Sequence, residues 1–168
     1  RATYQREAER AVQHLSLIGI DRIGVIHVED SFGADLYEGA MRGFAAVKKS
    51  PLFVEKFNRE KWDFSKIAPL VNSSGAQAVL FIGSGTAAVD GIAAIRATGS
   101  RAQIITNSNN ASGGFVKALK ENAHGLIVTQ VFPNERSLAA PIVKEASDLA
   151  TAKGLDGVSP AMLEGFAA

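Results

Sequence analysis

Hydrophobic residues change their spacing several times along the chain, and each change predicts a new element. Short, nearly continuous apolar runs are typical of strands buried on both faces of a sheet. They alternate with longer stretches in which apolar residues recur every three or four positions, as on helices that pack against a sheet. The runs predict strands at residues 23–28, 52–57, 76–82, 103–106 and 125–131. The longer stretches predict helices at residues 5–18, 33–47, 63–71, 86–97, 113–119 and 138–152, and a last helix that starts at Pro160.

The first and third predicted helices have marked faces and ends. The first has an apolar stripe formed by Ala8, Ala11, Val12, Leu15 and Ile18, and Gly19 is placed to end it. Asp63 is placed to cap the third helix. Strands that alternate with helices favour parallel pairing through right-handed crossovers. The sequence therefore predicts an α/β fold, a doubly wound parallel sheet of about five strands with helices on both faces.

Small polar residues follow three of the predicted strands. In open α/β sheets, ligands bind beyond the carboxyl ends of the strands. The residues at that edge are Glu29, Asp30, Ser31 and Phe32 after the first strand, Gly83, Ser84, Gly85 and Thr86 after the third, and Asn107, Ser108, Asn109 and Asn110 after the fourth. This set is rich in hydroxyls and amides and poor in charge. It favours a small polar ligand held by neutral hydrogen bonds.

The turn at residues 83–86 allows a second interpretation. Backbone amides at the start of a helix can hold a phosphate, which would suit a nucleotide- or phosphate-using α/β enzyme. The turn has no P-loop lysine, and Ala88 stands where a dinucleotide fingerprint has its third glycine. A tight strand-to-helix turn and a contact with a small ligand both remain open.

Candidate catalytic and metal-binding residues are few. His14, His27 and His124 fall on a helix face, inside a strand and before a strand, and no Gly-x-Ser-x-Gly motif is present. Glu29 and Asp30 could bind Mg²⁺, but an anionic pair at a helix entry is the favoured interpretation. We therefore expect a binding protein and not an enzyme, with no catalytic residues, no metal and no cofactor.

Composition limits the classes of partner that the chain is expected to bind. The 168 residues suffice for one domain or a little more, and 18 Lys and Arg against 17 Asp and Glu give a net charge of +1, so nucleic acid is not an expected partner. The chain has no cysteine, and no apolar run reaches the roughly 18 residues that span a bilayer. Residues 1–4 run directly into a helical pattern and show no signal peptide. We expect the chain to be part of a longer protein.

Several phrases carry a family resemblance. They are Arg1-Ala-Thr-Tyr-Gln-Arg-Glu7, the segment from Leu15 to Val25, Asp30-Ser-Phe-Gly33, Trp62-Asp-Phe-Ser65 and Leu163-Glu-Gly-Phe166. Together, over essentially the whole chain and in register, they resemble the type I periplasmic binding proteins of the leucine/isoleucine/valine-binding branch. The resemblance implies two α/β lobes with a ligand clamped between them. Residues 1–133 would be the second, ligand-binding lobe, and residues 134–168 a return segment that belongs to the other lobe.

The resemblance also implies a function. Members are periplasmic or membrane-tethered extracytoplasmic receptors of ABC importers, so the implied partners are a small-molecule solute and a membrane permease. A ligand-sensing domain of a signalling receptor is an alternative on the same fold. The ligand contacts carried over to this chain are Tyr4, Phe32, Ser84, Gly85, Thr86 and Ser108.

One departure from the family's pattern bears on the class of ligand. The family's amino-acid binders use an acidic group in this lobe, whereas Tyr4 and Ser108 stand at the corresponding positions here. This favours an aromatic amino acid, a small aromatic acid, an amide or a urea-like solute over a branched-chain amino acid. Tyr4 and Phe32 are expected to sandwich a flat ligand. The apolar stripe within residues 138–152 is expected to pack against a neighbouring chain or to be displaced.

Overall fold

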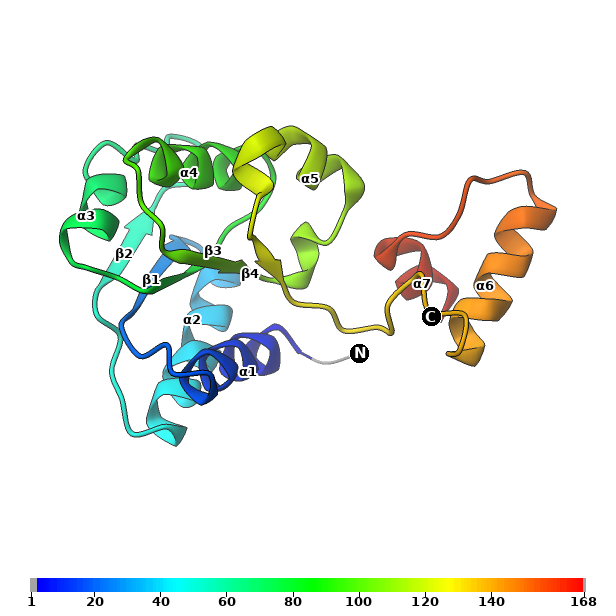
Figure 1. The fold of residues 1–168 in the computed structure, drawn as a ribbon, viewed down its shortest axis with the longest axis horizontal. Coiled ribbons are helices and arrows are strands. Elements are labelled where there is room, and N and C mark those ends of the chain that lie inside the picture. Colours follow the sequence, from blue (N-terminus) through cyan, green and yellow to red (C-terminus); the bar gives the residue numbers. More distant parts are fainter. Residues whose placement is uncertain (1–2, 168) are drawn as a thin grey trace.

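A five-stranded parallel sheet forms the centre of the protein (Figure 1). The structure is a computed structural model and describes residues 3–167. The strands are β1 (Ile23–Val28), β2 (Val54–Phe57), β3 (Ala78–Ile82), β4 (Gln103–Thr106) and β5 (Ile127–Val128), in the order β2-β1-β3-β4-β5. Every neighbouring pair is parallel. The predicted doubly wound α/β sheet is confirmed.

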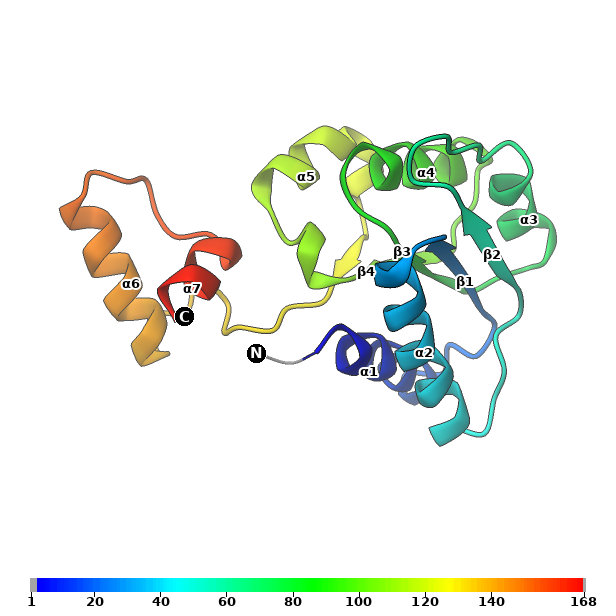
Figure 2. The same ribbon diagram turned by 180° about the vertical axis from the view of Figure 1, so that it is seen from behind.

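Helices cover both faces of the sheet, as Figures 1 and 2 show from opposite sides. One face carries α1 (Tyr4–Leu17) and α2 (Ser31–Ala46), and the other carries α3 (Ile67–Ser73), α4 (Gly85–Ala97) and α5 (Gly113–Leu119). Short 3₁₀ turns, η1 (Ser108–Asn110) and η2 (Lys120–Ala123), flank α5. Successive β1 residues alternate between the two cores: Val25 packs with α1 and α2, and Ile26 packs on the opposite face. All six residues of β1 are buried, as its continuous apolar run predicted.

The C-terminal helices stand apart from the sheet (Figures 1 and 2). They are α6 (Pro141–Ala152) and α7 (Pro160–Phe166), reached by a connection that leaves β5. Val143, Ala146 and Leu163 form a small buried cluster between them, separate from the two cores of the sheet. Leu149 and Met162 remain 46% and 40% exposed. This helix pair therefore has its own core and a partly uncovered apolar surface.

Several predicted boundaries were wrong. Ile18 is 54% exposed, because it follows the last turn of α1 and lies beyond the buried stripe. The third helix starts at Ile67, and the carboxylate of Asp63 accepts from the Ser65 N–H in a preceding turn instead of capping the helix. The fifth strand has two residues, since it is an edge strand that pairs only with β4 before the chain turns away. The sixth helix starts at Pro141, a residue suited to the first helical turn.

Candidate ligand-binding site

Asn110 joins the carboxyl ends of β3 and β4. Its side-chain nitrogen donates to the Gly83 carbonyl at 2.9 Å and to the Thr106 hydroxyl at 2.8 Å, and the residue is 2% exposed. These bonds hold η1 against the turn at the start of α4. The polar residues that follow β3 and β4 therefore share one edge of the sheet, as predicted.

Glu7 of α1 lies buried beneath this edge. Its Oε1 accepts from the Ser108 hydroxyl at 2.8 Å, and its Oε2 accepts from the Ser108 backbone N–H at 2.9 Å. The Thr129 hydroxyl also donates to Oε2, at 2.8 Å. One carboxylate thus fixes η1 and the segment after β5 to the first helix. Nothing in the local sequence singles out Glu7, which looks like an ordinary acidic residue in a first helical turn.

Tyr4 and Phe32 meet directly at the start of α1 and α2. Their ring centroids are 5.2 Å apart and the planes are inclined by 82°, an edge-to-face contact. Asp30 caps α2 by accepting from the Gly33 N–H at 2.9 Å, which places Phe32 in the first turn. The two rings touch each other, so in this structure no flat ligand fits between them.

Arg59 reaches the turn at the start of α4 from the loop after β2. Its Nε donates to Asp30 Oδ2 at 2.7 Å, and its Nη1 donates to the Ser84 hydroxyl at 2.7 Å. Its guanidinium carbon lies 5.9 Å from the Phe32 ring centroid. Partial desolvation disfavours the Asp30 carboxylate, but the Gly33 N–H and Arg59 outweigh it and lower the pKa of Asp30. No local pattern in the sequence points to Arg59, because its partners Asp30 and Ser84 lie 29 and 25 positions away.

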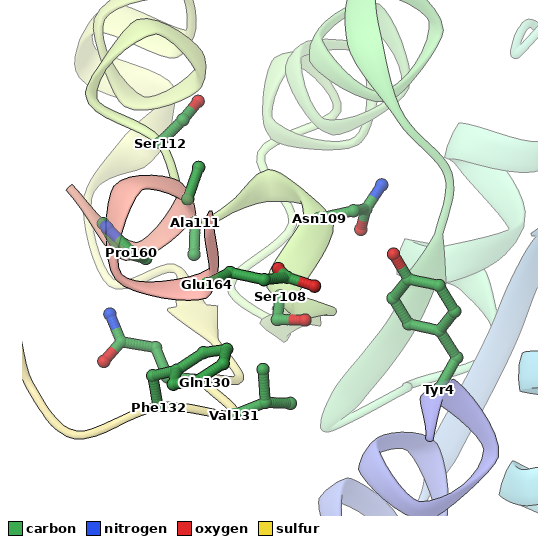
Figure 3. Close-up of a pocket in the computed structure, with 11 residues that line it drawn as sticks. Tyr4, Ser108, Asn109, Ala111, Ser112, Gln130, Val131, Phe132, Pro160 and Glu164 are labelled. Carbon is green, nitrogen blue, oxygen red and sulfur yellow. The ribbon is translucent and has the colours of Figure 1, made fainter. Parts of the chain in front are cut away.

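A hollow of about 190 Å³ opens at the carboxyl end of β4 (Figure 3). Its lining comes from the start of α1, from η1 and the residues after it, from the segment after β5, and from α7. The described lining residues are Tyr4, Ser108, Asn109, Ala111, Ser112, Gln130, Val131, Phe132, Pro160, Ala161 and Glu164. Figure 3 shows Tyr4 entering from one side and the segment with Gln130 and Phe132 on the other. The hollow thus lies between the sheet and the C-terminal helix pair.

A second, more open hollow of about 400 Å³ lies beside α4 and α5. Gly85 and Thr86 line it, and it shares Asn109 and Ser112 with the first hollow. The predicted contact residues are therefore divided. Tyr4 and Ser108 line the first hollow, Gly85 and Thr86 line the second, Phe32 packs on Tyr4, and Ser84 binds Arg59.

His27 has a structural environment inside β1. It is 4% exposed and stacks on Tyr37, with ring centroids 4.9 Å apart. Its Nδ1 lies 3.0 Å from the Val28 carbonyl oxygen, and among the described residues its Nε2 has no hydrogen-bond partner. Burial lowers the pKa of His27. The part of the chain that the structure describes holds no group of three or more His, Cys, Asp or Glu residues that could bind a metal ion.

Solved structures of similar fold cover nearly all of this chain. A substrate-binding periplasmic protein from Ralstonia solanacearum is 26% identical, with a TM-score of 0.81 over 99% of this chain and 48% of its own. A structure from Rhodopirellula baltica SH 1, described as a possible leucine/isoleucine/valine-binding protein, is 23% identical. Its TM-score is 0.86, and the match covers 99% of this chain and 47% of the other. A fatty acid ABC transporter substrate-binding protein from Thermomonospora curvata is 15% identical. Its TM-score is 0.81, and the match covers 99% of this chain and 44% of the other.

The comparisons show the family of the chain and how much of the length of similar proteins it covers. The chain spans about half the length of these solved structures. No curated protein matches it. Between residues 3 and 167, no helix combines the length and the apolar character needed to cross a membrane. The family model described as periplasmic binding protein matches residues 1–166, and the chain belongs to that family.

Proposed function

We propose that this chain contributes the ligand-binding lobe of an extracytoplasmic receptor that delivers a small solute to an ABC importer. The observation that carries the proposal is the 190 Å³ hollow at the carboxyl edge of the sheet, where Tyr4 and Ser108 meet polar side chains from two other segments. Family membership supports the same role. The receptor binds and releases its solute without chemistry. It works in the periplasm or tethered to the outer side of a membrane, and its closed form docks on a permease.

Residues 1–133 form this lobe, and residues 134–168 belong to the other lobe of the receptor. The separate core of α6 and α7 supports this division, as does their distance from the sheet in Figures 1 and 2. The solved relatives are about twice as long as this chain, so they have room for a second lobe. The hollow lies between the sheet and α7, which is where a ligand held by two lobes would sit.

The ligand is an amino acid or a related small polar or aromatic solute. The hollow offers the Tyr4 ring and the Phe132 ring beside the polar groups of Ser108, Asn109 and Gln130. The names of the similar structures include both a leucine/isoleucine/valine-binding protein and a fatty acid receptor. One fold therefore accommodates different solutes, and the lining of this hollow decides between them.

A nucleotide-using enzyme is the alternative, and one observation favours it. Arg59 places a cation beside Ser84 at the start of α4, where a phosphate would need one. The same guanidinium is already paired with Asp30. A sensor domain of the same fold would bind solute in the same hollow and differ only in what it is joined to.

Calorimetric titration of the two-lobe receptor that contains this chain tests the proposal. Pooled amino acids and small aromatic acids or amides should bind, and pooled nucleotides should not. Tyr4→Ala should weaken the binding at least tenfold, and Glu60→Gln, an exposed residue after β2, should leave it unchanged. Binding of nucleotides alone, abolished by Arg59→Ala, would favour the enzyme instead.

A further inference from the structure

Another hollow lies at the opposite edge of the sheet from the candidate ligand-binding site. It has a volume of about 400 Å³ and is lined by the end of α4, by the segments that lead into β4 and β5, and by η2. Because the strands are parallel, the amino ends of β4 and β5 meet at this edge. A molecule bound here would not touch a solute held at the carboxyl edge.

Arg96, in the last turn of α4, brings a partly buried cation to this hollow. Its Nη1 donates to the Ala102 carbonyl oxygen at 2.8 Å and to the Ser100 carbonyl oxygen at 3.3 Å, which fixes the guanidinium at the wall. Burial lowers the pKa of Arg96, and no carboxylate of residues 3–167 forms an ion pair with it. A guanidinium has five N–H donors, so those on Nε and Nη2 are left for a ligand.

Ser100 adds a buried hydroxyl to the same wall. The residue is 7% exposed, and its Oγ accepts from the Ala102 N–H at 3.3 Å. Within the described part of the chain, no acceptor receives the hydroxyl hydrogen. Leaving a buried donor without an acceptor costs free energy, which a bound acceptor would recover. The wall therefore combines a fixed cation with a hydroxyl that can donate.

The remaining lining residues make the hollow net positive. Arg101 is exposed there and, like Arg96, forms no ion pair among the described residues. Glu121 is the one acid in the described lining, so two arginines against one glutamate leave a charge of +1 with His124 neutral. The Asn122 amide also lines the hollow and can donate. The site thus offers more donors and more positive charge than its own residues satisfy.

We infer that this hollow binds a phosphate group, with Arg96, Ser100 and Arg101 as its donors. The planar fork of an arginine matches two phosphate oxygens, and a doubly charged phosphate with its several oxygens suits two guanidinium groups and a hydroxyl. Arg59 at the carboxyl edge differs, because Asp30 already pairs with its charge. The inference goes beyond the proposed receptor function and does not depend on it, since the two hollows lie at opposite edges of the sheet.

Hydrogen exchange measured by mass spectrometry on the two-lobe receptor that contains this chain tests the inference. Exchange in about 20 mM inorganic phosphate is compared with exchange in sodium chloride of the same ionic strength. Residues 96–103 and 121–126 should exchange more slowly in phosphate. A dissociation constant of about 5 mM would slow local exchange about fivefold at that concentration. Glycerol 3-phosphate is the second probe. Equal protection by both probes would assign binding to the phosphate group alone, and stronger protection by the ester would show that the rest of the hollow contributes.

Two variants and a control locate the effect. Arg101→Gln removes an exposed guanidinium that has no ion pair to lose, so the fold should be intact and the protection should fall to about twofold or less. Ser100→Ala removes the buried hydroxyl and should weaken the protection in the same direction. Arg136→Gln is the matched control, because it removes the same charge from a side chain that is 88% exposed outside the hollow. It should keep the full protection.

Three results would overturn the inference. One is equal exchange in phosphate and chloride, and another is slower exchange that persists in both Arg101→Gln and Ser100→Ala. The third is slower exchange spread over the whole receptor, since phosphate stabilises folded proteins in general by exclusion from their surfaces. Solute binding by Arg101→Gln in the calorimetric titration should equal that of the original receptor, so the phosphate site and the receptor function fail or stand separately.

Discussion

Gly39 of α2 lies directly against the backbone of Gln5 in α1. A Cβ atom on Gly39 would stand 2.1 Å from the Gln5 carbonyl oxygen, far inside any normal contact. The close approach of these helices carries Tyr4 and Glu7 to the edge of the sheet. Gly39→Ala should therefore push α1 away and lower the free energy of unfolding by about 1–3 kcal/mol, measured by urea denaturation.

The matched control for this substitution is Gly114→Ala in α5. There the nearest atom to a new Cβ is the Ser112 hydroxyl oxygen, at 4.0 Å. With space available, alanine should be neutral or stabilising by up to about 1 kcal/mol, because it favours helix more than glycine does. Equal effects of the two substitutions would show that close helix packing is not the cause.

Asn110→Ala should loosen the site as well as the fold. It removes two buried hydrogen bonds and leaves the Gly83 carbonyl and the Thr106 hydroxyl without this donor, at a cost of about 1–3 kcal/mol. Amide hydrogen exchange of residues 83–86 should become faster. Asn72, which is exposed and makes one bond of 3.3 Å, is the control, and Asn72→Ala should change stability by less than about 0.5 kcal/mol. Unchanged exchange at the turn in Asn110→Ala would contradict this role.

Asp30 combines a helix cap with the contact to Arg59. Asp30→Ala should cost about 1–2 kcal/mol, because the Gly33 N–H loses its acceptor. Asp30→Ser keeps a capping oxygen and loses only the partly exposed pair with Arg59, so it should cost less than about 1 kcal/mol. Since the pKa of Asp30 is lowered in the fold, its stabilising contribution is present at neutral pH and is lost as the pH falls through that lowered pKa. Thermal melting at two pH values measures both effects.

His27 should make the protein less stable in mild acid. Burial lowers its pKa and outweighs the Val28 carbonyl, which raises it, while Lys56 adds to the lowering. Below about pH 6.5, His27 therefore binds a proton in the unfolded chain more readily than in the folded chain. The free energy of unfolding falls as the pH drops below that value. The slope from this one group is at most about 1.4 kcal/mol per pH unit.

Urea unfolding at pH 7.5 and pH 5.5 measures this slope. His27→Phe, which keeps a ring beside Tyr37, should be less sensitive to pH than the original chain. His14→Gln, on the exposed side of α1, controls for the loss of a histidine as such. A pH dependence that is the same in His27→Phe would place its origin elsewhere.

The apolar surface of α6 and α7 should make the chain associate when it is produced alone. Leu149 and Met162 line one shallow groove there and are 46% and 40% exposed. We expect Leu149→Glu combined with Met162→Glu to reduce association in sedimentation velocity experiments. Leu17, 85% exposed at the end of α1, provides the control, since Leu17→Glu should leave association unchanged. A parent chain that is monomeric in the same experiment would contradict this prediction.

Much of the fold could be predicted from periodicity, but boundaries and side-chain partners could not. The fourth strand and the fifth helix match their predicted ranges, and Ser112 caps the start of that helix by accepting from the Phe115 N–H. The predicted fifth strand was too long, since the length of an edge strand depends on how much of its one neighbour is available. The Tyr4 and Phe32 rings were expected to hold a ligand between them, and the packing of α1 on α2 brings them into contact instead.

By itself, the sequence determined the succession of strands and helices along the chain, the parallel sheet and the edge at which polar residues gather. These features follow from local spacing, because each element buries its own apolar side. Only the tertiary structure decided that Glu7 binds Ser108, 101 positions away, and that Arg59 reaches Ser84. Such pairs depend on strand order and helix packing, which place distant side chains within hydrogen-bond distance, and no local pattern records them.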